Sequence, residues 1–194
     1  MIVLASNSAS RRAMLAASGV AFEAIPAHID ERALEASLAG ESPEKVARTL
    51  AVEKAMAVSS AGENRWVLGS DSLVVVDGRR FDKPRSRAEA ADHLRFFSNR
   101  AMHLHSAAAL VRGGHLVCDC SDKAVLHVRQ LSEAFIDDYL DAEWPAVAGC
   151  VGVFRIEGPG VQLFNSVEGD HFTILGMPLF KVLHALRQCG AMHQ

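Results

Sequence analysis

A run of hydroxyl groups and arginines at residues 6–12 joins an apolar segment to a helical one. The run reads SNSASRR; it follows IVLA and precedes the alanine- and leucine-rich AMLAAS. Hydroxyls, backbone N–H groups and the positive end of a helix favour a phosphate, and arginine can contact two phosphate oxygens at once. The pattern indicates a phosphate site, whereas serines that only cap the helix are the alternative. Because Arg11 and Arg12 lie about 100° apart on a helix, we expect only one to face such a site.

Carboxylates follow apolar runs at two places in the chain. Asp30 and Glu31 come after the alternating run VAFEAI, and Asp71 separates WVLG from LVVV. A carboxylate at the end of a buried strand can bind Mg²⁺ or position a water molecule for attack. Asp71 is therefore the strongest single candidate for chemistry. Exposed acidic residues without any such role are common in proteins, and this is the alternative interpretation of Asp30 and Glu31.

Two lysines could supply positive charge to a phosphate chain. Lys54 lies in the apolar helical run LAVEKAMAV, and Lys83 precedes Pro84 just beyond a turn at residues 77–78. A lone lysine in such a helix usually points to solvent, but its aliphatic stem can also reach into a cleft. Together with the carboxylates, the lysines give the chain acidic groups for a metal ion and basic groups for phosphates.

The elements that must position these residues are those of an α/β protein with one mixed, twisted β-sheet, because strand and helix patterns alternate along the chain. We predict a strand at residues 2–5, a helix ending near Gly19, a strand at residues 20–25, a helix from Ser42 to about Gly62, strands at residues 66–69 and 73–76, a hairpin turn at Asp77 and Gly78, a helix from Ser86 through Phe97, strands at residues 101–112 and 115–128, a helix from Ser132 to Trp144, a hairpin turning at residues 158–160, and a last helix from Pro178.

The composition is that of a globular protein and excludes several functional classes. The 194 residues are 49% hydrophobic and 22% charged, which predicts a real core, and we expect one folding unit. A net charge of −3 argues against a general nucleic-acid binder, which usually needs a basic face. The N-terminus, MIVLAS, lacks the pattern of a signal peptide, and no apolar run approaches the roughly 20 residues of a membrane span. A cytoplasmic protein without a membrane partner is expected.

The four cysteines are interpreted as free thiols of a reducing compartment. Only Cys118 and Cys120 are close in sequence, and in the alternating run HLVCDC they point to the same face of a strand. That geometry is poor for a metal ion without further ligands.

The segment LASNSASRRAML resembles the signature of the Maf family, in which Leu-Ala-Ser-x-Ser-Pro precedes arginines and a leucine-rich helix. Further segments resemble Maf segments in the same order and with the spacing preserved: AVEKA, VLGSDSLVVVDG, KP at residues 83–84, AEAADHLRFFSNRAMHLHSAAAL, VGVFRIEGPGVQLF and VEGDHFTILGMPL. The resemblance covers nearly the whole chain. It implies a single domain over residues 1–194 with a Maf/ITPase-like fold, in which two lobes flank a nucleotide cleft, and it implies a homodimer in many members.

The resemblance also implies an activity, the house-cleaning hydrolysis of a nucleoside triphosphate to its monophosphate and pyrophosphate. Asp71 would be the general base, and with Asp30 and Glu31 it would hold a divalent cation, Mg²⁺, Mn²⁺ or Co²⁺. The phosphate contacts that the resemblance implies come from Ser6, Ser8, Arg11, Lys54 and Lys83. These roles agree with the chemistry, because a cation and several basic groups stabilise the charge on the departing pyrophosphate.

Three positions that vary within the family concern the choice of base. They are occupied here by Ser10, Ser72 and Glu157, and Ala9 replaces the usual proline. A branch resembling dTTP/UTP pyrophosphatases has Arg, Thr and Gln at the three positions, and a branch resembling 7-methyl-GTP pyrophosphatases has an aromatic residue, Gln and Glu. The chain matches neither set fully. Glu157 and the placement of the double arginine favour the second branch, and hence a guanine-type triphosphate.

Other functions stay open from the sequence. One is a non-catalytic, nucleotide-binding regulator of cell division, although the presence of Asp71 and Lys83 argues for catalysis. A sugar-nucleotide transferase would need a glycine-rich loop where this chain has Ser, Asn and Ala. A metal-dependent hydrolase could use His103 and His105, but no recognisable motif supplies a third ligand.

Overall fold

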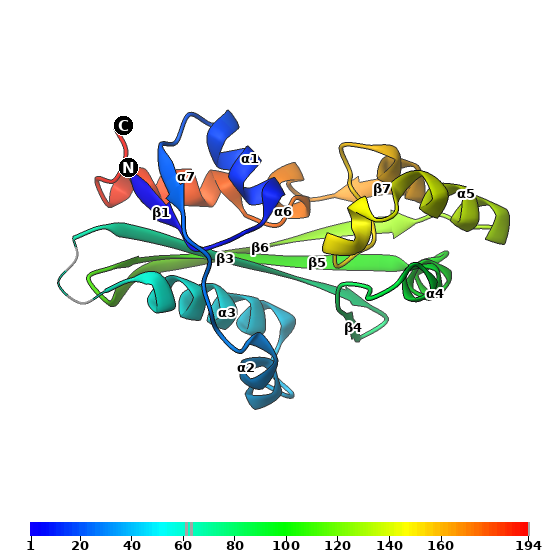
Figure 1. The fold of residues 1–194 in the computed structure, drawn as a ribbon, viewed down its shortest axis with the longest axis horizontal. Helices are drawn as coiled ribbons and strands as arrows, with labels where there is room; N and C mark the ends of the chain where they lie inside the picture. Colours follow the sequence, from blue (N-terminus) through cyan, green and yellow to red (C-terminus); the bar gives the residue numbers. More distant parts are fainter. Residues whose placement is uncertain (61, 63, 194) are drawn as a thin grey trace. The chain divides into compact units, whose positions relative to one another are not determined.

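The computed structural model describes residues 1–60, 62 and 64–193, which fall into two compact units (Figure 1). The first unit consists of Met1–Ser72, His105–Lys123 and Asp170–Gln194. The second unit consists of Leu73–Leu104 and Ala124–Gly169. Whether the whole chain folds as one domain stays a prediction.

The strands of the described residues form one mixed sheet in the order β2-β1-β3-β5-β6-β7, with β4 paired to β3. The strands are β1 (Ile2–Leu4), β2 (Phe22–Ala24), β3 (Trp66–Val76), β4 (Arg79–Phe81), β5 (Ala101–Arg112), β6 (His115–Val128) and β7 (Phe164–Glu168). β1 pairs in parallel with both β2 and β3, whereas β4 pairs antiparallel with β3. The predicted α/β fold with a single mixed sheet is therefore confirmed, as are the long strands β5 and β6.

Successive side chains along β1 and β3 point to opposite faces of the sheet, so the core of the first unit has one part on each face. Ile2, Leu4 and Leu68 pack in one apolar cluster with residues of α1 (Ala9–Ala17) and α7 (Leu179–Gln188). The intervening residues, among them Val3 and Val67, pack in another cluster with Ala55 of α3 (Pro43–Val58). Figure 1 shows α1 and α7 on one side of these strands and α3 on the other.

A close approach of α3 to β3 depends on Gly69. A Cβ atom at this position would lie 2.7 Å from the backbone nitrogen of Ala55 and would also meet the carbonyl oxygen of Ala51. Only glycine permits this contact between helix and strand backbones. The contact brings the face of α3 that carries Lys54 against the part of β3 that carries Asp71.

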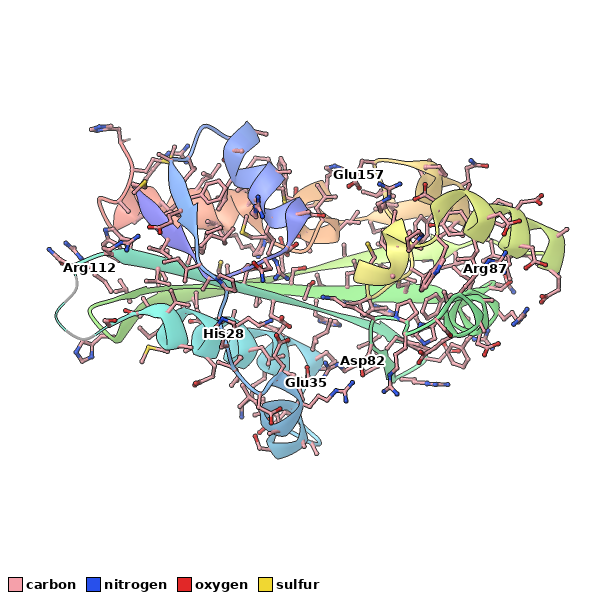
Figure 2. All side chains as sticks on the ribbon, in the orientation of Figure 1. His28, Glu35, Asp82, Arg87, Arg112 and Glu157 are labelled. Atoms are coloured by element: carbon pink, nitrogen blue, oxygen red, sulfur yellow. The ribbon has the colours of Figure 1, made fainter. Side chains whose placement is uncertain are left out.

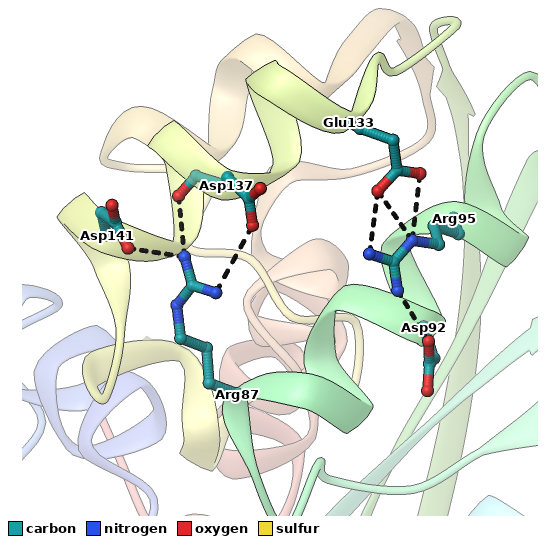
Figure 3. A network of polar contacts seen from close by, with 6 residues as sticks. All are labelled: Arg87, Asp92, Arg95, Glu133, Asp137 and Asp141. Atoms are coloured by element: carbon teal, nitrogen blue, oxygen red, sulfur yellow. Dashed lines mark hydrogen bonds and ion pairs between the residues drawn. The ribbon is translucent and has the colours of Figure 1, made fainter.

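The second unit contains α4 (Arg87–Phe97) and α5 (Glu133–Glu143), each opened by a serine cap. Their facing surfaces carry two clusters of ion pairs, which Figure 3 shows from close by. Arg95 donates to both carboxylate oxygens of Glu133, and Arg87 contacts Asp137 and Asp141. Arg87 is half-buried and the other side chains are exposed, so these pairs contribute little to stability.

Two expectations about strands were wrong. β3 runs without a break from Trp66 to Val76, so Asp71 lies within a strand and not at its end. The strand tolerates Ser70 because its buried hydroxyl donates to the carbonyl of Ala107, which satisfies the polar group. The second expected hairpin is absent from the described residues: residues 151–158 contain turns and a bend but no strand, and a 3₁₀ helix, η2 (Pro159–Leu163), precedes β7.

The helices agree with the sequence patterns except at α2 (Glu31–Ser37) and α6 (His171–Ile174), which were not expected. α3 ends at Val58, before the predicted end near Gly62; residue 61 in that stretch lies outside the described residues. None of the helices in the described part of the chain combines the length and apolar character that a bilayer span requires.

Candidate active site

The loop between β1 and α1 presents hydroxyl groups at the start of the helix, as the sequence predicted. Ser8 is the N-cap of α1, and its Oγ accepts a hydrogen bond from the backbone N–H of Arg11. The backbone N–H of Ser8 donates in turn to the Oγ of Ser6, which is buried. Ser10 lies half-buried in the first turn of the helix. Ser8 therefore does cap the helix, which was the alternative to a phosphate contact. The hydroxyl of Ser6 is directed toward Arg11.

Arg11 is the member of the arginine pair that points inward, whereas Arg12 is exposed. Its Nε donates to the carbonyl of Gly176 at 2.9 Å, and its two terminal nitrogens donate to Ser6 Oγ at 3.4 Å and Ser72 Oγ at 3.2 Å. Burial lowers the pKa of Arg11, while the negative charges of Asp71 and Glu31 act in the opposite direction. Only one arginine of the two is thus buried, as expected from their spacing, and its contact with a phosphate stays a prediction.

Lys54 joins two carboxylates that the sequence placed in separate segments. Its Nζ lies 2.6 Å from Asp71 Oδ1 and 3.0 Å from Glu31 Oε2. Lys54 and Asp71 are both buried, whereas Glu31 lies at the exposed start of α2. A buried charge needs a partner, and here each of the two buried charges has one. Lys54 therefore reaches into a polar site and does not point to solvent.

The three carboxylates that could hold a cation have different hydrogen-bond and ion-pair partners. Asp30 is the N-cap of α2, and its Oδ1 accepts the backbone N–H of Ala33 at 3.0 Å. Asp71 and Glu31 both contact one positive group, the Lys54 ammonium, at 2.6 Å and 3.0 Å. Oxygen donors of this kind fit Mg²⁺, which is commonly held by one or two carboxylates together with substrate phosphates. Among residues 1–60, 62 and 64–193, no three acidic, histidine or cysteine side chains form a metal site by themselves.

The backbone carbonyl of Gly176, which the sequence did not indicate, contacts the side chain of Arg11. The Gly176 oxygen, in the loop between α6 and α7, accepts a hydrogen bond from Arg11 Nε and lies 3.2 Å from Ser70 Oγ, whose proton goes to the closer carbonyl of Ala107. Gly176 has a φ of +99°, and a Cβ atom there would lie 3.2 Å from Ser72 Oγ. The signal that could have identified it is the segment ILGMPL, where a glycine stands between two helical patterns just before a proline.

Lys83 and Glu157 belong to the second unit, and both are exposed. Figure 2 labels Glu157 on the loop that precedes η2. The pKa of Cys150 is raised first by burial and then by the charge of Glu157, while Arg155 and Lys83 act to lower it. All three charged residues therefore lie within electrostatic range of Cys150. The sequence did not single out Arg155 or Cys150 of this unit.

The sheet and the buried cluster define an α/β protein with a lysine–carboxylate site beside a hydroxyl-rich strand–helix loop. The family model described as "Maf-like protein" matches residues 1–189, and the chain belongs to the Maf family. The membership inferred from the sequence motifs is confirmed.

Named relatives cover almost the full length of the chain. A protein of Nitrobacter hamburgensis named nucleoside triphosphate pyrophosphatase is 46% identical over 191 residues, which are 98% of this chain and 95% of that protein. A protein of Sphingopyxis alaskensis with the same name is 45% identical, covering 100% and 99%. A protein of Rhizobium meliloti named 7-methyl-GTP pyrophosphatase is 44% identical, covering 99% and 98%.

Proposed function

We propose that this chain is a nucleoside triphosphate pyrophosphatase, which uses water to cleave a triphosphate between its α and β phosphates. The products are a nucleoside monophosphate and pyrophosphate. The observation that carries the proposal is the buried contact of Lys54 with Asp71, 2.6 Å long, in a chain whose relatives bear this name. A buried acid beside a buried base, next to an arginine and two hydroxyls, suits attack by water on a phosphate chain.

Asp71 has the role of general base in this proposal. It accepts a proton from the attacking water, whose oxygen forms the new bond to phosphorus while the bond to the bridging oxygen breaks and pyrophosphate departs. Lys54 touches Asp71 in the free protein and contacts phosphate oxygens in the complex. Arg11 and the hydroxyls of Ser6 and Ser8 contact phosphates on the other side of the site. Lys83, in the second unit, has the phosphate contact that the family resemblance implies.

The proposal includes a divalent cation held by Asp71 and Glu31, with Asp30 as a further acid in the adjoining turn. Mg²⁺, Mn²⁺ or Co²⁺ bound there would neutralise phosphate charge and lower the pKa of a bound water. Location in the cytoplasm, a homodimeric state and the absence of nucleic-acid and membrane partners stay predictions.

The base that we propose is a guanine-type base, including 7-methylguanine. A carboxylate at Glu157 can accept hydrogen bonds from the ring N–H and the exocyclic amine of guanine, a donor pair that uracil and thymine lack. Glu157 is exposed and therefore available for such a contact. Ser10 and Ser72 are small and leave more room than the Arg and Thr of the pyrimidine branch. Similarity to a protein named 7-methyl-GTP pyrophosphatase supports the same choice.

A pyrophosphate-release assay tests the proposal. The purified chain is incubated with GTP, 7-methyl-GTP, dTTP, UTP, ATP and CTP, each with Mg²⁺, Mn²⁺ or Co²⁺. We expect equimolar monophosphate and pyrophosphate from at least one triphosphate, and none when the cation is chelated. Binding of a triphosphate without any pyrophosphate release would contradict the proposal and would favour the non-catalytic regulator.

A further inference from the structure

The loop that carries Glu157 has an unusual backbone for which the structure shows specific supports. Val153 has a φ of 57°, a conformation that β-branched residues rarely adopt. The backbone N–H of Gly158 donates to the carbonyl of Arg155, which closes a turn around Glu157. A Cβ atom on Gly160 would lie 2.7 Å from the backbone nitrogen of Arg155, so the chain is tightly folded on itself here. A backbone of this kind persists only when its surroundings hold it.

An ion pair between the buried Glu143 and the half-exposed Arg155 connects this loop to the last turn of α5. Glu143 is 4% exposed, and its two carboxylate oxygens accept hydrogen bonds from Nε and Nη2 of Arg155, each at 2.9 Å. Such a two-point contact fixes the direction of the arginine as well as its distance. One helical turn earlier on α5, the hydroxyl of Tyr139 donates to the carbonyl of Val153 at 2.9 Å. The strained residue and the arginine of the loop are thus both tied to the same helix.

Arg155 links this support to Glu157. The hydrogen bonds with Glu143 are the main cause that raises the pKa of Arg155, and the charge of Glu157 raises it further. Arg155 and Glu157 also belong to one backbone turn, closed by the hydrogen bond from the Gly158 N–H to the Arg155 carbonyl, so the contact with Glu143 holds the same turn that carries Glu157. An exposed glutamate has many side-chain conformations of similar energy, and a fixed backbone and a neighbouring cation reduce that number.

We propose that Glu143 and Arg155 are positioning residues for base recognition: their ion pair fixes the loop at residues 150–160 and directs Glu157 toward the nucleobase. The inference rests on the proposed function and on the role of Glu157 in it. Glu143 is buried and does not itself touch the substrate. Its replacement should therefore change which base is preferred, more than it changes how fast the phosphate chain is cleaved.

The test is the ratio of kcat/KM for GTP or 7-methyl-GTP to kcat/KM for UTP, measured on one preparation of each variant. A partly unfolded preparation lowers both values equally, so the ratio reports on specificity alone. Glu143→Gln keeps the shape of the side chain and removes its charge. We expect the ratio to fall about tenfold, mainly through a higher KM for the guanine-type substrate, because a carboxylate contact of this type discriminates by roughly 10²-fold when fully formed.

Glu133→Gln is the matched control. Glu133 lies on the same helix and also accepts hydrogen bonds from Nε and Nη2 of one arginine, Arg95, but at the exposed surface that faces α4 (Figure 3). The control should leave the ratio unchanged within twofold. A change of the same size in both variants would show that any lost ion pair on α5 disturbs specificity, and would overturn the inference.

Two further variants separate this inference from the proposed function. Glu157→Gln alone should lower the ratio, and adding Glu143→Gln should lower it no further if Glu143 acts through Glu157. A ratio that responds to Glu157→Gln but not to Glu143→Gln overturns the positioning role and leaves the proposed function intact. If Glu143→Gln does not fold, Arg155→Lys replaces it; this variant keeps the charge but loses the two-point contact, and it should lower the ratio. A wild type without base preference, or without pyrophosphate release, also overturns the inference.

Discussion

Lys54 Nζ lies 2.6 Å from Asp71 Oδ1, and this contact joins a helix to the middle of a buried strand. Both side chains are buried, and Glu31 provides a second carboxylate 3.0 Å from the same ammonium group. The free protein thus keeps its candidate base paired with its candidate phosphate ligand. In the proposed reaction, Lys54 contacts the phosphates of a bound triphosphate in place of Asp71. Asp71 then accepts a proton from water.

Lys54→Met should affect both stability and catalysis. The variant leaves the Asp71 carboxylate buried without its closest partner, which should lower the free energy of unfolding by about 3–5 kcal/mol. Urea unfolding measures that loss, and kcat/KM for the preferred triphosphate should fall roughly 10²–10³-fold. Lys45→Met is the control, because Lys45 pairs with Glu41 at the exposed start of the same helix. Equal stability and activity in the two variants would contradict the paired site.

Gly176→Ala should disturb the position of Arg11. The substitution combines an unfavourable φ of +99° with a Cβ atom 3.2 Å from Ser72 Oγ and 3.7 Å from a terminal nitrogen of Arg11. We expect a loss of stability of about 1–3 kcal/mol and a fall in kcat/KM of at least tenfold. Gly190→Ala has a similar backbone requirement, with a φ of +68°, but no neighbour within 4 Å of the added atom. It should lose stability only, and a loss of activity as large as that of Gly176→Ala would show that strain alone is responsible.

The cysteines on β6 should react slowly at neutral pH. Burial raises the pKa of Cys118 and of Cys120 to about 11, so few of these thiols are ionised near pH 7.5. Because the thiolate is the nucleophile, alkylation by iodoacetamide should speed up about tenfold per pH unit until the pH approaches 11. Mass spectrometry of peptides labelled between pH 7 and 10 follows each site. Rapid labelling at pH 7.5 without this rise would show that the thiols are not held in the protonated form.

The sequence predicted best those parts of the site that depend on local structure. Ser8 was recognisable because a serine at the start of an apolar helical pattern caps it, and Arg11 because it follows within one turn. The contact of Lys54 with Asp71 was not predictable, since the two residues are 17 positions apart and meet only because Gly69 lets α3 approach β3. The resemblance to the Maf family named both residues without indicating that contact.

Other errors have a physical reason in tertiary structure. Ser70 and Ser72 suggested a break between two strands, since serine favours turns, but hydrogen bonds with distant groups let them lie inside β3. The expected hairpin around Gly158 and Gly160 came from alternating hydrophobicity. Tight folding of the backbone at Gly160 and the tie from Arg155 to Glu143 produce a compact loop in its place. No short-range sequence pattern indicates this ion pair, because Arg155 and Glu143 are 12 residues apart in the chain.

The most direct test of the account is the turnover of Asp71→Asn in the pyrophosphate-release assay. The substitution keeps the shape of the side chain in β3 and removes its basic charge. A general base contributes about 10²–10⁴-fold to rate, so kcat should fall by at least that lower factor while the protein stays folded by circular dichroism. Asp77→Asn, at the exposed turn that ends the same strand, should keep its activity within twofold, because asparagine tolerates the φ of 48° there. Near wild-type turnover by Asp71→Asn would contradict the central claim that Asp71 activates the attacking water.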